Sequence, residues 1–202
     1  MFKIIRIDRL ARYISICTIS LSVLTFWLLS LISPDISLFK IITLTSVVSL
    51  LIMSILVIPF FARKIWKLIR KIDRSIYPDL NGTWEGEVDT GDKKFPVRCV
   101  IRQGLLKTEI DMHGETMKSI TIETTPKKES GQNKLYYTYR SSPKNANYSD
   151  YYGSTLFDIR NVNVENKNYL ELTGKYFTDR KTVGRIALKQ TSSDMNKDVS
   201  YY

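Results

Sequence analysis

Tyrosines and arginines are the residues in this chain best suited to ligand chemistry, because the sequence lacks the usual catalytic sets. One histidine, His113, and two cysteines form no cluster of the kind that holds zinc. No Ser/His/Asp order surrounds His113, and no glycine-rich phosphate loop or paired-carboxylate motif occurs. The sequence therefore predicts no catalytic, metal or cofactor site, and it favours a binding protein over an enzyme.

Tyrosines recur on one face of two expected strands. Tyr137 and Tyr139 alternate with other residues in 134–140, and Tyr176 ends a similar alternation in 167–177. Side chains two apart face the same side of a strand, so these phenols would point into one interior. Aromatic rings stack on nucleotide bases and their hydroxyls can hydrogen-bond, which suits a base as ligand. A solid core, with hydroxyls reaching solvent at the rim, is an equally good interpretation.

Arginines in the polar part of the chain are candidate phosphate ligands. The planar guanidinium matches the geometry of a phosphate group. Most of these arginines are expected to be solvated surface charges. Arg180 is the preferred exception, because it follows the Tyr176 strand in a turn, and Arg140 is the second.

Eight short strands are expected to position these side chains. From Leu80 onward the apolar period is two, and Gly-, Asn- and Asp-containing turns separate the segments. The expected strands are 82–89, 95–102, 105–113, 116–124, 133–140, 152–162, 167–177 and 181–190. This order predicts an eight-stranded, antiparallel, up-and-down β-barrel over 78–191, lipocalin-like, with a loose polar tail at 192–202. Trp84, in a Gly-x-Trp strand, is expected to plug one barrel end.

The first third of the chain is predicted to form a hairpin of two transmembrane helices. After a basic segment at 1–12, the region 13–62 holds two uncharged apolar runs, 14–33 and 41–62. Each run has about the 20 residues that a transmembrane helix needs. Most of the net charge of +10 flanks these runs, which predicts cytoplasmic N- and C-termini and contact with anionic lipid. A DNA or RNA partner is not expected, since such charge would lie in the folded domain.

An amphipathic basic helix is expected at 63–77, between the hairpin and the barrel. Apolar residues recur there at helical spacing with basic residues between them, and a tryptophan lies just past the apolar run. This helix could lie on lipid or pair with a neighbouring subunit. The residues expected to couple the barrel to the membrane are Ile65, Trp66, Leu68, Ile69 and Ile72.

The motif Leu80-x-Gly82-x-Trp84-x-Gly86, the two apolar runs and the segment from 172 to 188 carry a family resemblance. Together they resemble the SMODS-associating two-transmembrane, β-strand-rich effectors of cyclic-oligonucleotide anti-phage signalling (CBASS). The resemblance covers nearly the whole chain. It implies a cytoplasmic barrel that senses a cyclic dinucleotide as its activating ligand. Binding would drive homo-oligomerisation, disruption of the bacterial inner membrane and cell death.

Two other functions fit parts of the sequence. The first is a membrane-anchored, lipocalin-like barrel that binds an apolar ligand. The second is a structural membrane scaffold with a solid barrel. An apolar ligand would not require Tyr137, Tyr139, Tyr176 and Arg180 to face the interior, so the barrel interior separates the first alternative from a nucleotide receptor.

Overall fold

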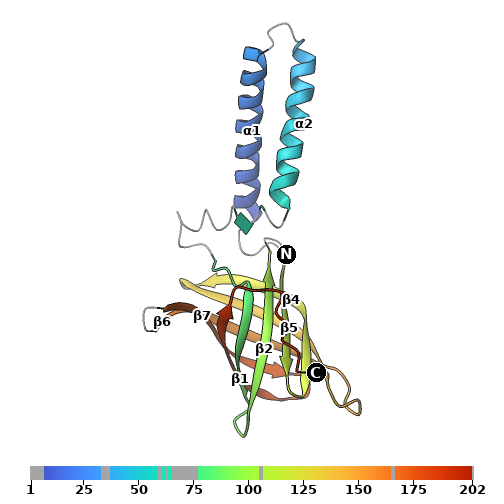
Figure 1. The fold of residues 1–202 in the computed structure, drawn as a ribbon, viewed down its shortest axis with the longest axis vertical. Helices are drawn as coiled ribbons and strands as arrows, with labels where there is room; N and C mark the ends of the chain where they lie inside the picture. The colour runs from blue at the N-terminus through green and yellow to red at the C-terminus, as the bar shows by residue number, and fades with distance from the viewer. Residues whose placement is uncertain are drawn as a thin grey trace. The chain divides into compact units, whose positions relative to one another are not determined.

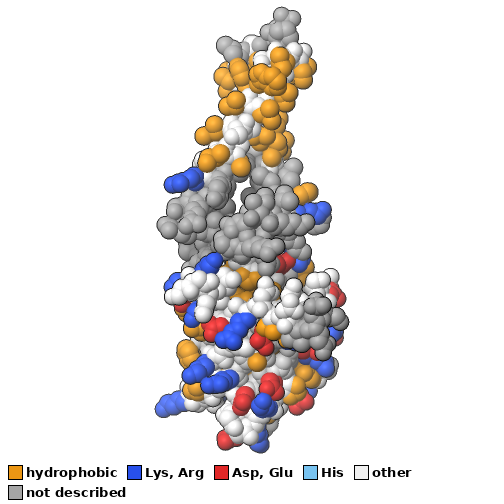
Figure 2. Space-filling view, turned by 90° about the vertical axis from the view of Figure 1, so that its left-hand side faces the viewer, with side chains coloured by type: hydrophobic (Ala, Val, Ile, Leu, Met, Phe, Trp, Pro, Cys, Tyr) orange, Lys and Arg blue, Asp and Glu red, His pale blue; other side chains and the backbone are white. Residues whose placement is uncertain are grey.

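The protein consists of a helical unit and an all-β unit (Figure 1). The structure, a computed structural model, describes residues 7–32, 37–58, 61, 63–64, 77–104, 107–164 and 167–201. Hydrophobic side chains dominate the visible surface of the helices, whereas Lys, Arg, Asp and Glu are interspersed over the barrel (Figure 2). The expected fold class, two N-terminal helices followed by an all-β domain, is confirmed.

The two helices, α1 (Ile7–Ile32) and α2 (Leu38–Val57), pack together as a hairpin. The hydroxyl oxygens of Ser22 and Ser49 lie 3.1 Å apart across their interface. Thr45, one helical turn before Ser49, is buried on the same face of α2. Small hydroxyl-bearing side chains let helix backbones approach closely and can hydrogen-bond between helices. Ser22 and Ser49 therefore serve helix packing within the hairpin. Other hydroxyls bond a carbonyl one turn earlier in their own helix: those of Thr25, Thr43, Ser46 and Ser54.

One helix has a clear membrane length. Within α1, the 18 residues Ser15–Ile32 are long and apolar enough to cross a membrane. The apolar stretch described in α2, Phe39–Ile52, is shorter. The second expected span, 41–62, extends into positions outside the described residues, as does the amphipathic helix expected at 63–77. Its five coupling residues lie outside the described residues as well: Ile65, Trp66, Leu68, Ile69 and Ile72.

Eight antiparallel strands form a closed barrel in sequence order, with β8 paired to β1. The strands are β1 (Gly82–Asp89), β2 (Lys94–Gln103), β3 (Thr108–Gly114), β4 (Met117–Glu129), β5 (Gln132–Pro143), β6 (Tyr151–Val164), β7 (Lys167–Thr178) and β8 (Val183–Ser192). Each expected strand corresponds to one of these. Closure leaves no free sheet edge along most of the barrel, which is how an isolated sheet of this size avoids pairing with other chains.

Strand β4 is longer than the expected 116–124, because 126–129 continue to pair with β5. Pro126 lies in this extension, although proline lacks the amide hydrogen that a strand normally donates. Among the described residues, β4 pairs with β3 only as far as Ile120. The described part of β4 beyond that point pairs with β5 alone, so Pro126 is tolerated as on an edge strand.

The barrel end at which the chain enters is filled by side chains. Trp84 is fully buried, and its indole N–H donates to the carbonyl of Leu80 at 2.9 Å. The amide of Leu80 donates to Oε1 of Gln103 at 2.7 Å. The side chain of Asn81 bonds the backbone of Gln103 in both directions, at 2.9 and 2.7 Å. These satisfied polar groups allow the large indole of Trp84 to be buried at this end.

The C-terminal tail is not loose, and this corrects the expectation for 192–202. Its residues 193–201 lie along the outer wall of the barrel. The carbonyl of Asp194 accepts a hydrogen bond from the hydroxyl of Thr83 at 2.7 Å, and Val199 is only 4% exposed. The polar composition predicted solvation, but one apolar anchor and a few polar contacts hold the segment on the wall.

Candidate functional site

The barrel is open at the end opposite Trp84. The β1–β2, β3–β4, β5–β6 and β7–β8 connections all lie at this end. A cavity of about 230 Å³ enters the barrel between them. Aromatic and hydroxyl-bearing side chains make up much of its wall: Tyr137, Tyr139, Tyr151, Tyr176, Ser119, Thr155, Thr178 and Thr182. The strand alternation that aims these residues inward thus produces a polar-aromatic interior at this end.

Three tyrosines predicted from the sequence meet in this cavity. The rings of Tyr137 and Tyr139 stack with centroids 5.0 Å apart and planes at 28°. Tyr137 also packs on Phe157, with centroids 6.3 Å apart, so it belongs as much to the core as to the cavity. Tyr139 and Tyr176 are each 8% exposed. These two rings are therefore the better candidates for direct contact with a ligand.

Two glycines set the positions of these rings. A Cβ added at Gly153 would lie 2.4 Å from the Tyr139 ring, and one added at Gly184 would lie 2.6 Å from the Tyr176 ring. Side-chain atoms do not approach this closely, so each ring occupies space that a side chain on the neighbouring strand would fill. The glycines at 153 and 184 are thus part of the site, although neither offers a ligand any polar side chain.

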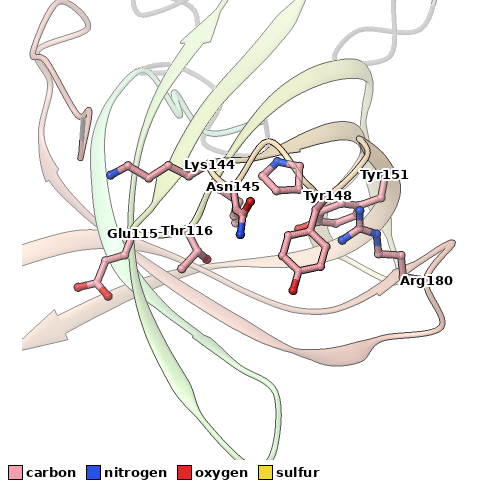
Figure 3. Close-up of a pocket in the computed structure, with 9 residues that line it drawn as sticks. Glu115, Thr116, Lys144, Asn145, Tyr148, Tyr151 and Arg180 are labelled. Carbon is pink, nitrogen blue, oxygen red and sulfur yellow. The ribbon is translucent and has the colours of Figure 1, made fainter.

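A larger cleft of about 580 Å³ adjoins the cavity, and it shares Glu115, Thr116, Met117 and Tyr151 with it. Figure 3 shows Tyr148, Tyr151 and Arg180 on one side of this cleft and Glu115 and Thr116 on the other. The β5–β6 connection contributes Lys144, Asn145 and Tyr148. Two cationic side chains, Lys144 and Arg180, therefore border a space that opens directly onto the tyrosine cavity.

Arg180 is held at the cleft by aromatic rings and a backbone carbonyl. Its guanidinium carbon lies 4.4 Å from the centroid of the Tyr151 ring and 5.9 Å from that of Tyr148. It also donates a hydrogen bond to the carbonyl of Ser149. The β7–β8 turn is fixed against β6 by Asp179, whose carboxylate accepts from the amide of Tyr152 at 3.0 Å. The turn thus presents a guanidinium whose donors are only partly used.

Arg140 is not brought to the same place. It is exposed on the outer wall, and its Nε lies 3.6 Å from a carboxylate oxygen of Asp150. Alternation explains the difference, because Arg140 follows the inward-facing Tyr139 by one residue. Of the five predicted ligand residues, the structure groups Tyr137, Tyr139, Tyr176 and Arg180 and leaves Arg140 apart.

Sequence reasoning missed several residues of the site, among them Lys144, Tyr148 and Tyr151. The first two lie in the irregular β5–β6 connection, where periodicity carries no information about direction. Tyr151 begins β6 one residue before the strand predicted at 152–162. Its inward orientation follows from that strand's alternation, so a longer predicted strand would have identified it.

The two spaces together suit a ligand of two parts. The cavity is smaller than the roughly 300–1,000 Å³ of typical small-molecule sites, whereas the cleft lies within that range. A single planar ring can enter the cavity beside Tyr139 and Tyr176, where hydroxyls can meet its polar edge. An anionic group can lie in the cleft near Arg180 and Lys144.

Alkaline pH is expected to destabilise the barrel through its buried tyrosines. Burial raises the pKa of Tyr137 and of Tyr139 above the ordinary value of 10.0. The folded state keeps both phenols protonated where the unfolded chain releases the protons, so stability is constant below about pH 9 and falls above about pH 10. The loss approaches about 1.4 kcal/mol per pH unit for each tyrosine. Urea unfolding at about pH 8 and about pH 11 measures it, and equal midpoints would contradict the burial of these phenols.

Comparison with known proteins relates the barrel to one family. Residues 75–190 match the family described as "Cap15, cyclic dinucleotide receptor domain". CD-NTase-associated protein 15 of Staphylococcus schleiferi is 32% identical over 130 residues. The aligned region is 62% of this chain and 66% of that relative, just under two thirds of its length. These matches confirm the resemblance that the Trp84 motif and the segment around Arg180 carry.

Proposed function

The chain belongs to the Cap15 cyclic dinucleotide receptor family, and on this premise we propose that it is a membrane effector switched on by a cyclic dinucleotide. The ligand binds at the open barrel end, and its binding drives the helical hairpins of several copies to associate and disrupt the bacterial inner membrane. The observation that carries this proposal is the tyrosine-lined cavity that opens into a cleft bordered by Arg180 and Lys144.

One base of the ligand enters the barrel cavity. Tyr139 and Tyr176 offer ring surfaces for stacking, which is worth about 1–3 kcal/mol per base. The hydroxyls of Thr155, Thr178 and Thr182 on the cavity wall can bond the polar edge of the base. Neutral donors and acceptors of this kind orient a base without the cost of burying a charge.

The sugar–phosphate ring and the second base remain in the cleft. Arg180 exchanges its bond to the carbonyl of Ser149 for bonds to a phosphate, whose negative charge and geometry match the guanidinium better than a neutral carbonyl does. Tyr148 and Tyr151 flank the guanidinium and can stack on the second base. The ligand thereby joins the β5–β6 connection to the β7–β8 turn, two segments that no strand pairing links directly.

Ligand binding acts by changing how the helical hairpins associate, and the protein is not an enzyme. A single hairpin of two helices is too small to enclose an aqueous path, so damage to the membrane needs several copies. Ligand can shift this equilibrium only by binding the associated form more tightly than the monomer. We assign the coupling between barrel and hairpin to the segment 63–77, through its expected apolar positions Ile65, Trp66, Leu68, Ile69 and Ile72.

The hydroxyl groups of the cavity favour a nucleotide over an apolar ligand. The wall contains aliphatic side chains such as Val88, Met112 and Ile186, as a lipocalin-like carrier would, but its phenols and threonine hydroxyls are polar partners that an apolar ligand would leave unused. A structural scaffold with a solid barrel would not need a cavity at the open end. Both alternatives predict that cyclic dinucleotides leave the melting temperature of the protein unchanged.

The hairpin is expected to place both chain termini in the cytoplasm, at the inner face of the membrane. The basic residues that flank both apolar runs should be retained on that side. A reporter active only in the cytoplasm, fused after Tyr202, should be active, and one that needs periplasmic export should be silent. The reverse result would contradict the topology and the sensing of a cytoplasmic ligand.

Co-expression of the full chain with a cyclic-dinucleotide synthase is expected to depolarise the inner membrane and stop growth. A potential-sensitive dye and colony counts measure the two effects. The matched control is the same chain without residues 7–58, which should bind ligand and remain harmless. Depolarisation by this truncated chain would refute the hairpin as the toxic part, and unchanged polarisation with every synthase tried would refute the receptor role.

A further inference from the structure

Three side chains on the outer wall of the barrel are buried, although their positions in the strands point them outward. Thr83 on β1, Val100 on β2 and His113 on β3 point outward, because their neighbours along each strand face the interior. They are nevertheless only 0%, 1% and 6% exposed. Thr83 is paired with Val100, and His113 is paired with Arg98, which lies two residues from Val100 on β2. Thr83, Val100 and His113 are therefore neighbours on one face. We call this set the wall groove.

The C-terminal tail, residues 193–201, lies on the face of the barrel that carries the wall groove. Near its start, the carbonyl of Asp194 accepts from the hydroxyl of Thr83 at 2.7 Å. Near its end, the Tyr201 ring lies 4.6 Å from the guanidinium of Arg98, the residue paired with His113. Between these points Val199 is 4% exposed. The tail therefore crosses β1 and β2 with Val199 as its apolar anchor, and it lies beyond the family match at 75–190.

The other contacts that hold the tail are exposed. The ammonium of Lys197 lies 3.4 Å from the carboxylate of Glu85, and both side chains are about half exposed, so water screens their attraction. A second copy of the same tail would make the contacts from Lys197 to Tyr201 equally well. The bond of Asp194 to Thr83, in contrast, lies too close to the end of β8 to be exchanged. Exchange of identical segments between copies is a low-cost route to association, because few contacts are lost.

The end of the tail is connected to the ligand cleft. Lys144 borders the cleft, and its ammonium donates to the carbonyl of Tyr201 at 3.4 Å. A phosphate in the cleft is a stronger acceptor for an ammonium than a backbone carbonyl. Ligand binding at the cleft would therefore draw Lys144 away from the tail and loosen its last residues.

We propose that ligand binding releases the tail from its own barrel and that the tail then occupies the wall groove of a neighbouring copy. This inference rests on the proposed ligand-driven association. Residues 193–196, extended at about 3.3 Å each, can span about 13 Å between the end of β8 and Lys197, so the exchange requires the two barrels to lie in contact. Each copy gives one tail and receives another, so the contact is head-to-tail and can close a ring. Copies held in one membrane meet at high effective concentration, which favours the exchange.

Cysteine pairs in the full-length protein test the exchange. The exposed thiol is removed by Cys17→Ser, and the buried Cys99 is kept. Two differently tagged chains, one with Lys197→Cys and one with Glu85→Cys, are co-expressed, and membrane vesicles are treated with a thiol oxidant. The probes are cyclic di-GMP, cyclic di-AMP and cyclic GMP-AMP. The activating probe is expected to produce a disulfide-linked product that carries both tags.

Two variants serve as matched controls. Lys197→Cys paired with Asp158→Cys, on the far strand β6, reports random collision and should give no product above background. Val199→Asp, added to the Lys197→Cys chain, should remove the two-tag product while the chain still binds the same probe. If the two-tag product is still formed by the Val199→Asp chain, Val199 does not anchor the tail in the wall groove of the neighbouring copy.

An independent measure of association, fluorescence transfer between labelled copies, separates this inference from the proposed function. A third chain carries both Lys197→Cys and Glu85→Cys. If the probe causes association but the disulfide forms only within this single chain, the exchange is overturned and the proposed function stands. A two-tag product of equal amount without any probe would overturn the coupling through Lys144. No association with any probe would overturn the proposed function and the exchange with it.

Discussion

Replacing Trp84 with alanine is expected to lower the free energy of unfolding of the barrel by about 3–5 kcal/mol, as for large aromatic truncations in a core. The indole is fully buried and its N–H is satisfied by the carbonyl of Leu80. The variant leaves a void at the closed barrel end and an unpaired carbonyl beside it. Urea denaturation followed by far-ultraviolet circular dichroism measures the change.

The matched control is Tyr152→Ala. Tyr152 is also an aromatic residue on a strand, but it faces outward on β6 and is 53% exposed. Its truncation should cost less than about 1 kcal/mol, because substitutions at exposed sites rarely change stability by more. A similar small cost for Trp84→Ala would show that the indole does not fill the barrel end.

Loss of Arg180 is expected to weaken binding of the activating cyclic dinucleotide by about 1.5–3 kcal/mol, or about 10- to 150-fold. Its guanidinium is the cation at the cleft that the β7–β8 turn and Tyr151 hold in place. Tyr139→Ala should cost a further 1–3 kcal/mol or so through the lost stack. Isothermal titration of the full chain in detergent with each dinucleotide measures both effects.

Arg140→Ala is the matched control for Arg180→Ala. Both substitutions remove one guanidinium, but Arg140 lies on the outer wall beside Asp150. Its loss should leave affinity within about twofold, apart from a small uniform effect of net charge. Equal losses for the two variants would mean that general electrostatic attraction binds the ligand, and unchanged affinity in Arg180→Ala would move the phosphate site elsewhere.

A hydrophobic period of two, read along the chain, was sufficient to predict all eight strands and the inward direction of Tyr137, Tyr139 and Tyr176. Period and direction are local properties, because successive side chains of a strand alternate between its two faces. Two uncharged runs with basic flanks predicted the helical hairpin for the same reason, since the cost of burying a charge in lipid is set residue by residue. The motif around Trp84 also gave the resemblance from which the family was predicted.

The membership of the site was decided by tertiary structure. Sequence chemistry ranked Arg180 ahead of Arg140 and kept both as candidates. Strand alternation turns Arg140 to the outer wall, but only barrel closure places the Arg180 turn beside the cavity. Lys144 and Tyr148 come from an irregular connection whose direction depends on what it packs against.

The β4 extension and the seated tail also depended on the fold as a whole. Pro126 is tolerated because β3 stops pairing with β4 before that point, a fact about another strand. Val199 is buried although its neighbours in the tail are polar, because the tail contacts β1 at Thr83 and β2 at Arg98, which are distant in the chain. The sequence by itself thus determined which faces each element presents, since that follows from local geometry. Tertiary structure alone decided which faces meet, since burial and contact arise only between segments distant in the chain.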